Sequence, residues 1–233
     1  MNETGPERKV YPSTQADIAQ LHYALERSEE RVRVLEYDKL TDLWNNTVIR
    51  EKLEQYIEEA KETGRTFAFL IADLDKTKEV NDTISHIKGD EYIRAFADSV
   101  RDNDFVVGRS GGDEFYFMLF LEDARNKHSD SSELREVYLS PEDQVEAASL
   151  SVEKRALAKI QEIGLGDIGG VSVGGAVFDV NETLESLVNR ADKRMYQRKF
   201  EKKERKEAKD RHPSHTSVSS QGSSTCLLGI TKK

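Results

Sequence analysis

Two adjacent acids, Asp113 and Glu114, directly follow a pair of glycines, Gly111 and Gly112. Apolar, β-prone runs lie on both sides, and glycine tolerates the positive φ of tight turns, so the spacing predicts a β-hairpin with both acids at its tip. Adjacent carboxylates repel each other, and backbone without a Cβ lets a ligand come close. The pattern indicates either a site for a cation or a donor-rich ligand, or an ordinary surface turn.

A second acidic pair, Asp73 and Asp75, ends an apolar run of buried-strand character over residues 66–72. Carboxylates at the end of a central strand, facing carboxylates on a hairpin, are typical of a Mg²⁺ or Mn²⁺ site. Two such ions can activate an attacking oxygen and stabilise a leaving one in phosphoryl or nucleotidyl transfer. The alternative is that Asp73 or Asp75 caps the segment that follows it.

The composition limits the class of protein. A chain of 233 residues with 36% hydrophobic residues suits one domain with accessory segments. The net charge of -9 argues against binding to nucleic acid or to an anionic membrane. One cysteine, Cys226, excludes an intramolecular disulfide and fits a reducing compartment. Since no apolar run approaches the roughly 20 residues of a membrane helix, and residues 1–9 lack a signal-peptide core, we expect a cytoplasmic protein.

Periodicity divides the chain into four parts. Residues 1–14 form a polar lead that we expect to be disordered. Residues 15–37 predict a helix with apolar residues on a heptad seam, and these are Ile18, Leu21, Leu25, Val32 and Leu35. This helix is either a parallel dimeric coiled coil or a single amphipathic helix packed on its own domain. Residues 38–203 form the main domain, and residues 204–233 a charged and then Ser-rich tail.

Six separated segments resemble, in the right order, the GGDEF-domain diguanylate cyclases. They are Asp38–Asn45, Asp73–Asp82, His86–Asp90, Arg109–Phe115, Val171–Gly174 and Ala191–Tyr196. The resemblance implies an α/β (α+β) fold like the palm of nucleotidyl cyclases, in which helices flank a central, mostly antiparallel sheet. Within it we expect helices over residues 48–60, 145–163 and 183–203, the last followed by a charged extension to Arg211.

The resemblance also implies a reaction. Two GTP molecules would condense into cyclic di-GMP with release of two pyrophosphates, in a Mg²⁺-dependent homodimer whose product is also a feedback ligand. Asp73 and Asp113 would hold the metal, helped by the Leu74 carbonyl, while Glu114 would bind metal or assist deprotonation of the ribose 3′-hydroxyl. The alternative is a catalytically degenerate module that binds GTP or cyclic di-GMP as a signalling receptor.

For substrate binding, the resemblance assigns the guanine edge to Asn81 and Asp90, because an amide and a carboxylate complement its donors and acceptors. Three lysines would neutralise the phosphate charge, namely Lys78, Lys199 and Lys203. Backbone at Thr77 and at the two hairpin glycines would also contact the nucleotide.

The chain departs from the family pattern at several positions. Asp42 stands where the family usually has Gly, and Asn46 where it has Arg. Thr77 replaces a Phe, which a backbone contact tolerates. Ser85 replaces a Gly and is expected to stiffen its loop. Lys203 replaces an Arg, which removes the fork that grips a phosphate.

An Arg-x-x-Asp pattern formed by Arg101 and Asp104 resembles the family's product-inhibition site, where an Arg makes bidentate contacts to the cyclic dinucleotide. Its register differs from the usual motif by one residue. The alternative is a charged cluster that ends a helix.

Overall fold

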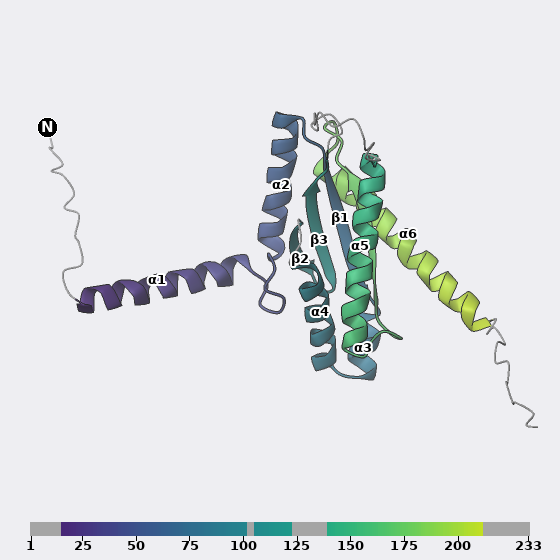
Figure 1. The fold of residues 1–233 in the computed structure, drawn as a ribbon, viewed down its shortest axis with the longest axis horizontal. Helices are drawn as coiled ribbons and strands as arrows, with labels where there is room; N and C mark the ends of the chain where they lie inside the picture. The colour runs from purple at the N-terminus through teal and green to yellow at the C-terminus, as the bar shows by residue number, and fades with distance from the viewer. Residues whose placement is uncertain (1–14, 102–104, 123–138, 212–233) are drawn as a thin grey trace, which may run out of the picture. The chain divides into compact units, whose positions relative to one another are not determined.

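The computed structural model describes residues 15–101, 105–122 and 139–211 (Figure 1). Residues up to Lys199 form one compact unit, and residues from Phe200 form a second, whose described part is the end of the last helix. The elements in chain order are α1 (Gln15–Glu36), α2 (Asn46–Thr63), β1 (Phe67–Asp75), α3 (Thr77–Thr83), α4 (His86–Val100), β2 (Val106–Gly111), β3 (Glu114–Phe120), α5 (Pro141–Glu162), β4 (Gly170–Val177) and α6 (Leu184–Arg211).

The four strands form one sheet in the order β2-β3-β1-β4, and each neighbouring pair is antiparallel. The acidic strand β1 therefore lies in the interior of the sheet, between the hairpin strand β3 and β4. This arrangement confirms the α+β architecture with an antiparallel sheet. It also confirms the hairpin, because β2 and β3 pair across the two glycines.

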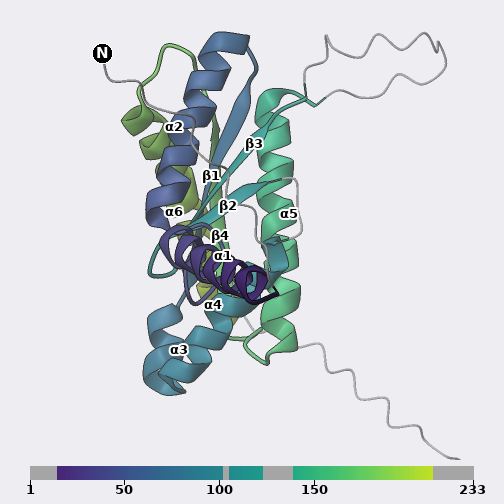
Figure 2. The same ribbon diagram turned by 90° about the vertical axis from the view of Figure 1, so that its left-hand side faces the viewer.

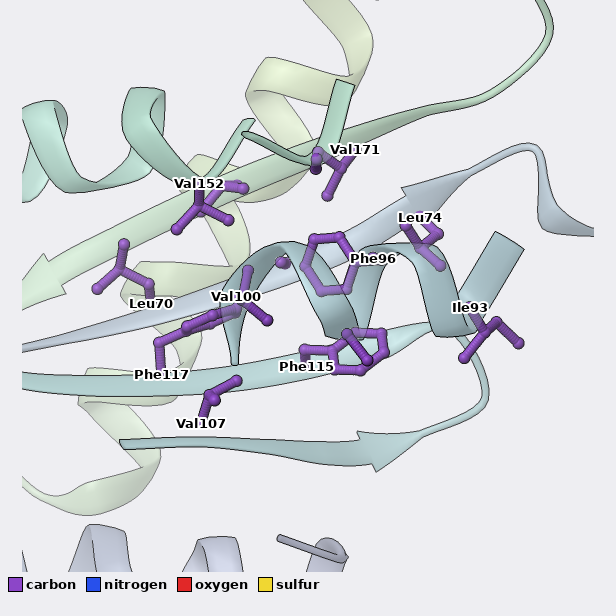
Figure 3. Packing of buried hydrophobic residues seen from close by; sticks show 14 of the residues in the cluster. Leu70, Leu74, Ile93, Phe96, Val100, Val107, Phe115, Phe117, Val152 and Val171 are labelled. Atoms are coloured by element: carbon purple, nitrogen blue, oxygen red, sulfur yellow. The ribbon is translucent and has the colours of Figure 1, made fainter. Parts of the chain in front are cut away.

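Both faces of the sheet are buried, and successive side chains of β1 point to opposite faces. Its even-numbered apolar residues, from Ala68 to Leu74, pack with α4 and α5. Its odd-numbered ones, from Phe67 to Ile71, pack with α2 and the first part of α6. Figure 2 shows α2 and α6 on one side of the sheet and α5 on the other. On the α4 side the Phe96 ring packs against the Phe115 ring, with centroids 4.5 Å apart (Figure 3).

The helix boundaries follow from capping residues. The Asn45 side chain accepts hydrogen bonds from the first turn of α2, and Gly64 ends that helix with a φ of 70°, as its position predicts. Ser140 and Pro141 begin α5 four residues before the predicted start at residue 145. The helix predicted over residues 183–203 and its charged extension form the single element α6.

Two expectations concern the ends of the chain. The helix predicted over residues 15–37 is confirmed as α1, whereas residues 1–14 and 212–233 lie outside the described residues. No helix in the described part of the chain combines the length and the apolar character needed to cross a membrane.

The glycine at 174 allows α6 to lie directly on β4. A Cβ at Gly174 would stand 2.0 Å from the Met195 nitrogen and 2.5 Å from the Ala191 carbonyl oxygen, and both are backbone atoms that cannot move alone. The close approach of helix and strand therefore requires glycine at this position.

We expect Gly174→Ala to lower the free energy of unfolding by about 3 kcal/mol, because overpacking against backbone forces helix and strand apart. Urea unfolding followed by circular dichroism measures this change. Gly111→Ala is the matched control, because a Cβ there meets nothing within 4 Å. Equal unfolding midpoints for the two variants would contradict the close-approach argument.

Candidate functional site

The register of two strands brings two of the predicted acids together. Asp73 of β1 is the direct cross-strand partner of Glu114 of β3. Both side chains belong to the α2–α6 face, because Ile71 and Tyr116, two residues away along each strand, are buried in that core. Directly opposed residues of an antiparallel pair have Cβ atoms about 5 Å apart. Two carboxylates distant in sequence therefore face each other.

The third acid, Asp113, lies at the hairpin tip beside the same end of β1. Its carbonyl oxygen accepts a hydrogen bond of 3.1 Å from the Leu74 N–H. The turn is made by Gly112, which has a φ of 48°. Arg109 supports the turn by donating to the Gly112 carbonyl at 2.9 and 2.5 Å. The structure thus places Asp73, Leu74, Asp113 and Glu114 at one end of the β1–β3 pair.

A lysine from α6 completes this group. The Lys199 Nζ lies 2.5 Å from an Asp73 carboxylate oxygen. Lys199 follows Met195 by one helical turn, so the close approach of α6 at Gly174 carries the lysine over the acidic strand end. The predicted lysine and the predicted acid therefore meet, although nothing in their local sequence pairs them.

The acids outnumber the cations in this group. Burial raises the pKa of Asp73, and Asp113 and Asp192 raise it further, although the Lys199 ammonium opposes them. Burial also raises the pKa of Glu114, with added repulsion from Asp73 and Asp113. Burial opposes the charge of Lys199, but the ion pair with Asp73 outweighs it and raises the pKa of that lysine. The net negative charge is what a bound cation would relieve.

The donor set fits Mg²⁺ in its chemistry, since it offers carboxylates and one backbone carbonyl. Within the residues that the structure describes, no three His, Cys, Asp or Glu side chains stand close enough together to hold a metal ion. The Leu74 carbonyl already accepts a hydrogen bond of 3.1 Å from the buried Thr77 hydroxyl. Lys199 occupies one oxygen of Asp73, so the ammonium holds a position where a metal would compete with it.

The residues predicted to read guanine also lie together. Asn81 lies in the second half of α3 and is half-buried, and Asp90 lies exposed in α4. A Cβ at Gly89 would stand only 1.9 Å from the Asn81 side-chain oxygen, so the Asn81 amide lies directly on the residue before Asp90. The short α3–α4 connection therefore places the Asn81 amide on the turn of α4 that carries Asp90.

Other predicted binding residues take different positions. Lys78 is exposed on α3, whereas Thr77 is buried beneath it. Lys203 is exposed on the part of α6 that belongs to the second unit. Ser85 has a φ of -176°, which is extended backbone that any residue adopts, so this position does not require glycine. The Ser85 hydroxyl caps α4 by accepting from the Lys88 N–H.

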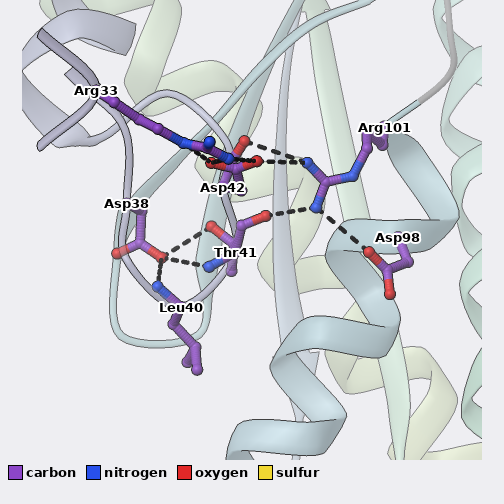
Figure 4. A network of polar contacts seen from close by, with 7 residues as sticks. All are labelled: Arg33, Asp38, Leu40, Thr41, Asp42, Asp98 and Arg101. Carbon is purple, nitrogen blue, oxygen red and sulfur yellow. Dashed lines mark hydrogen bonds and ion pairs between the residues drawn. The ribbon is translucent and has the colours of Figure 1, made fainter. Parts of the chain in front are cut away.

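The predicted inhibitory pair is described only at Arg101, because Asp104 lies outside the described residues. The Arg101 guanidinium donates to the Thr41 carbonyl at 2.8 Å and to the Asp42 carbonyl at 3.3 Å (Figure 4). It also pairs with Asp98 at 3.3 Å. This arginine is therefore tied to the loop that follows α1.

The sequence alone indicated no role for two acids, Asp192 and Asp38, that affect the charge and the geometry of the site. Asp192 acts electrostatically on both Asp73 and Glu114, and its spacing of two helical turns before Lys199 places it on the same side of α6. Asp38 accepts from Arg109 at 3.1 Å. Burial opposes the charge of Asp38, but hydrogen bonds from Thr41 and Arg109 hold its pKa below the ordinary value.

The family model described as "Diguanylate cyclase, GGDEF domain" matches residues 35–205 of the chain. The chain belongs to the GGDEF family. This match confirms the resemblance of the separated motifs, and it covers all the residues of the site described above.

Individual members of the GGDEF family are similar over most of this chain. Diguanylate cyclase DosC of Escherichia coli K12 is 35% identical over 165 residues, which are 68% of this chain and 32% of DosC. Probable diguanylate cyclase DgcJ of the same organism is 26% identical over 187 residues, 78% of this chain and 33% of DgcJ. The chain thus spans about a third of the length of these relatives.

The fold is also similar to that of solved GGDEF structures. The coiled coil and GGDEF domain of DgcB from Caulobacter crescentus, in complex with c-di-GMP, matches with a TM-score of 0.59 at 23% identity. The match covers 78% of this chain and 89% of that one. At this identity the likeness establishes the fold.

The raised pKa values at the GGDEF site predict how stability depends on pH. Between the ordinary carboxyl pKa and the raised one, the folded protein binds more protons than the unfolded chain, so stability falls as pH rises through this window. Without divalent ions, we expect Glu114→Gln to be more stable than the wild type at about pH 7. The gain should stay below about 1 kcal/mol, because solvent screens a partly exposed carboxylate.

Urea unfolding across the pH range measures this difference, which should vanish below about pH 4, where the carboxylate is protonated in both states. Glu62→Gln, at an exposed carboxylate of α2, is the control and should follow the wild type. A Glu114→Gln profile parallel to that of the wild type at every pH would contradict the electrostatic description.

Proposed function

We propose that the chain is a diguanylate cyclase, which condenses two GTP molecules into cyclic di-GMP and two pyrophosphates in a Mg²⁺-dependent homodimer. The observation that carries this proposal is the pairing of Asp73 with Glu114 across β1 and β3, next to Asp113. Membership of the GGDEF family and the similarity to DosC support it.

In this mechanism Asp73, Asp113 and the Leu74 carbonyl would hold the metal. When bound, Mg²⁺ supplies charge neutralisation for the phosphates and acidifies the attacking ribose hydroxyl. Glu114 would accept the proton of the ribose 3′-hydroxyl. Burial and neighbouring acids raise its pKa, which makes it a stronger base than an ordinary carboxylate.

Lys199 would also contribute to this reaction, by contacting a phosphate oxygen of the substrate. It remains protonated, because its pKa is raised by the ion pair with Asp73. In the absence of a nucleotide it balances the acidic strand end, and it can turn to a phosphate oxygen when the substrate brings negative charge of its own. Lys78 and Lys203 would add positive charge along the triphosphate, and the backbone of Thr77, Gly111 and Gly112 would line it.

Base recognition is proposed for Asn81 and Asp90. The Asn81 amide offers both a donor and an acceptor to the guanine edge, and the Asp90 carboxylate accepts from its N–H groups. The contact of Asn81 with Gly89 supports this, because it holds the amide beside Asp90.

A homodimer is proposed because each domain supplies one half of the reaction. The heptad residues of α1 support it, since they remain 45–73% exposed in the single chain. A parallel coiled coil would bury them and raise the effective concentration of the second half-site. The proposed location is the cytoplasm, where GTP is available.

A receptor that binds GTP or cyclic di-GMP without turnover is the second candidate. The observation that favours it is the Lys199–Asp73 ion pair, which occupies one of the proposed metal ligands. Turnover and binding measured on the same variants distinguish the two candidates.

We expect Asp113→Ala to reduce cyclic di-GMP formation at least about a hundredfold, because changes beside a metal ligand already cost that much. Purified protein is incubated with Mg²⁺ and labelled GTP, and the products are separated by chromatography. Glu114→Ala is the blank, and Glu62→Gln is the control that keeps wild-type turnover. Undiminished product from Asp113→Ala would refute the assignment, and GTP binding without product in the wild type would favour the receptor.

We expect Gly89→Ala to weaken GTP binding about tenfold, because the new methyl group displaces the Asn81 amide and removes a hydrogen bond to the base. Isothermal titration with GTP, and with ATP for comparison, measures the loss. In an Asn81→Ala background the clash is absent, so Gly89→Ala should have no further effect. Additive losses in the double variant would contradict the proposed role of the contact.

A further inference from the structure

One loop, residues 38–45 between α1 and α2, contacts both the N-terminal helix and the Gly-Gly hairpin. On one side Asp42 joins Arg33 of α1 and Arg101 at the end of α4 (Figure 4). On the other side Asp38 joins Arg109 of the hairpin. The loop therefore connects α1 to the hairpin both covalently and through ion pairs.

The backbone of Asp42 shows that this residue is held in place. Its φ of 55° lies in the left-handed region, which L-residues with a Cβ rarely adopt. By the family pattern glycine usually stands here. The Asp42 N–H donates to the Asp38 carbonyl at 2.8 Å, and the Asp42 carboxylate contacts both arginines.

Arg33 and Arg101 hold Asp42 in different ways. Arg33 contacts both carboxylate oxygens, at 2.8 and 2.7 Å through Nη2, with a further bond of 3.1 Å from Nε. Arg101 lies 3.6 Å from the same carboxylate and also donates to the carbonyls of Thr41 and Asp42. The loop is thereby fixed by a helix that precedes it and by a helix far along the chain.

The hairpin side of the loop is equally well connected. Arg109 donates to the Asp38 carboxylate at 3.1 Å and to the Gly112 carbonyl at the turn. Its backbone N–H donates to the Trp44 carbonyl at 2.8 Å. A shift of the loop would therefore move the turn that carries Asp113 and Glu114.

We propose that Arg33, Asp42 and Arg101 form an ionic latch, which holds the α1–α2 loop and through it the hairpin, so that release of α1 loosens the catalytic turn. All three are positioning residues. Their exposed side chains, at 61%, 45% and 37% exposure, contribute little to global stability. A weak, salt-sensitive contact suits a latch because it opens without unfolding the domain.

Amide hydrogen exchange of the full chain, without nucleotide, tests the latch independently of any turnover. We expect Arg33→Gln, Asp42→Asn and Arg101→Gln each to raise exchange at Gly111 and Gly112 by about two- to fivefold, the range that exposed ion pairs provide. Arg33→Gln combined with Asp42→Asn should raise it no further than Asp42→Asn alone, because that change already removes the partner of Arg33. Ionic strength of about 1 M should produce the same rise in the wild type.

Two controls separate the latch from general loosening. Glu59→Gln breaks the Arg65–Glu59 pair, which is similarly exposed at 52% and 44% but lies away from the loop, and should leave hairpin exchange unchanged. Asp42→Gly relieves the left-handed conformation, so it should raise hairpin exchange without lowering the unfolding midpoint. Exchange that rises in α1 alone, with the hairpin at the wild-type rate in all three single variants, would overturn the proposal. So would a rise of equal size in Glu59→Gln.

Discussion

The antiparallel register of β1 against β3 is the constraint on which the site depends. Side chains alternate between the faces of a strand, so a slip of one residue would move Asp73 to the α4–α5 face and separate it from Glu114. The register is held by the buried rings and aliphatic side chains on both faces, including Phe69, Phe115 and Phe117. The apolar core thus determines where two carboxylates meet, although neither carboxylate contributes to it.

The close packing of α6 on β4 brings the positive charge of Lys199 next to this acidic group. Gly174 lets the two backbones approach, and the helical rise then carries Lys199 to Asp73. The ion pair does not neutralise the group, because Asp192 arrives on the same helix and adds repulsion. The structure consequently holds a partly exposed surplus of negative charge at this end of the sheet, which a bound cation would relieve.

The loop between α1 and α2 contacts both the hairpin of the acidic site and helix α1. Asp38 supports the hairpin through Arg109, while Asp42 engages Arg33 and Arg101. The arginine that resembles half of an inhibitory motif is therefore committed to backbone carbonyls of this loop. The Arg33–Asp42 and Arg101–Asp42 contacts are exposed, whereas the Arg109–Asp38 contact beside the hairpin is more buried.

The sequence by itself determined the hairpin, the acidic strand end and the order of the motifs, because each depends on alternation, turn residues and spacing within a few positions. Through the family resemblance it also predicted that Asn81 and Asp90 contact guanine, whereas the Asn45 cap of α2 emerged from the structure. Only the tertiary structure decided that Asp73 faces Glu114, that Lys199 binds Asp73, and that Arg101 binds the loop. These contacts join residues far apart in the chain, and they are set by sheet register and by the packing distance of a helix, which local sequence does not encode.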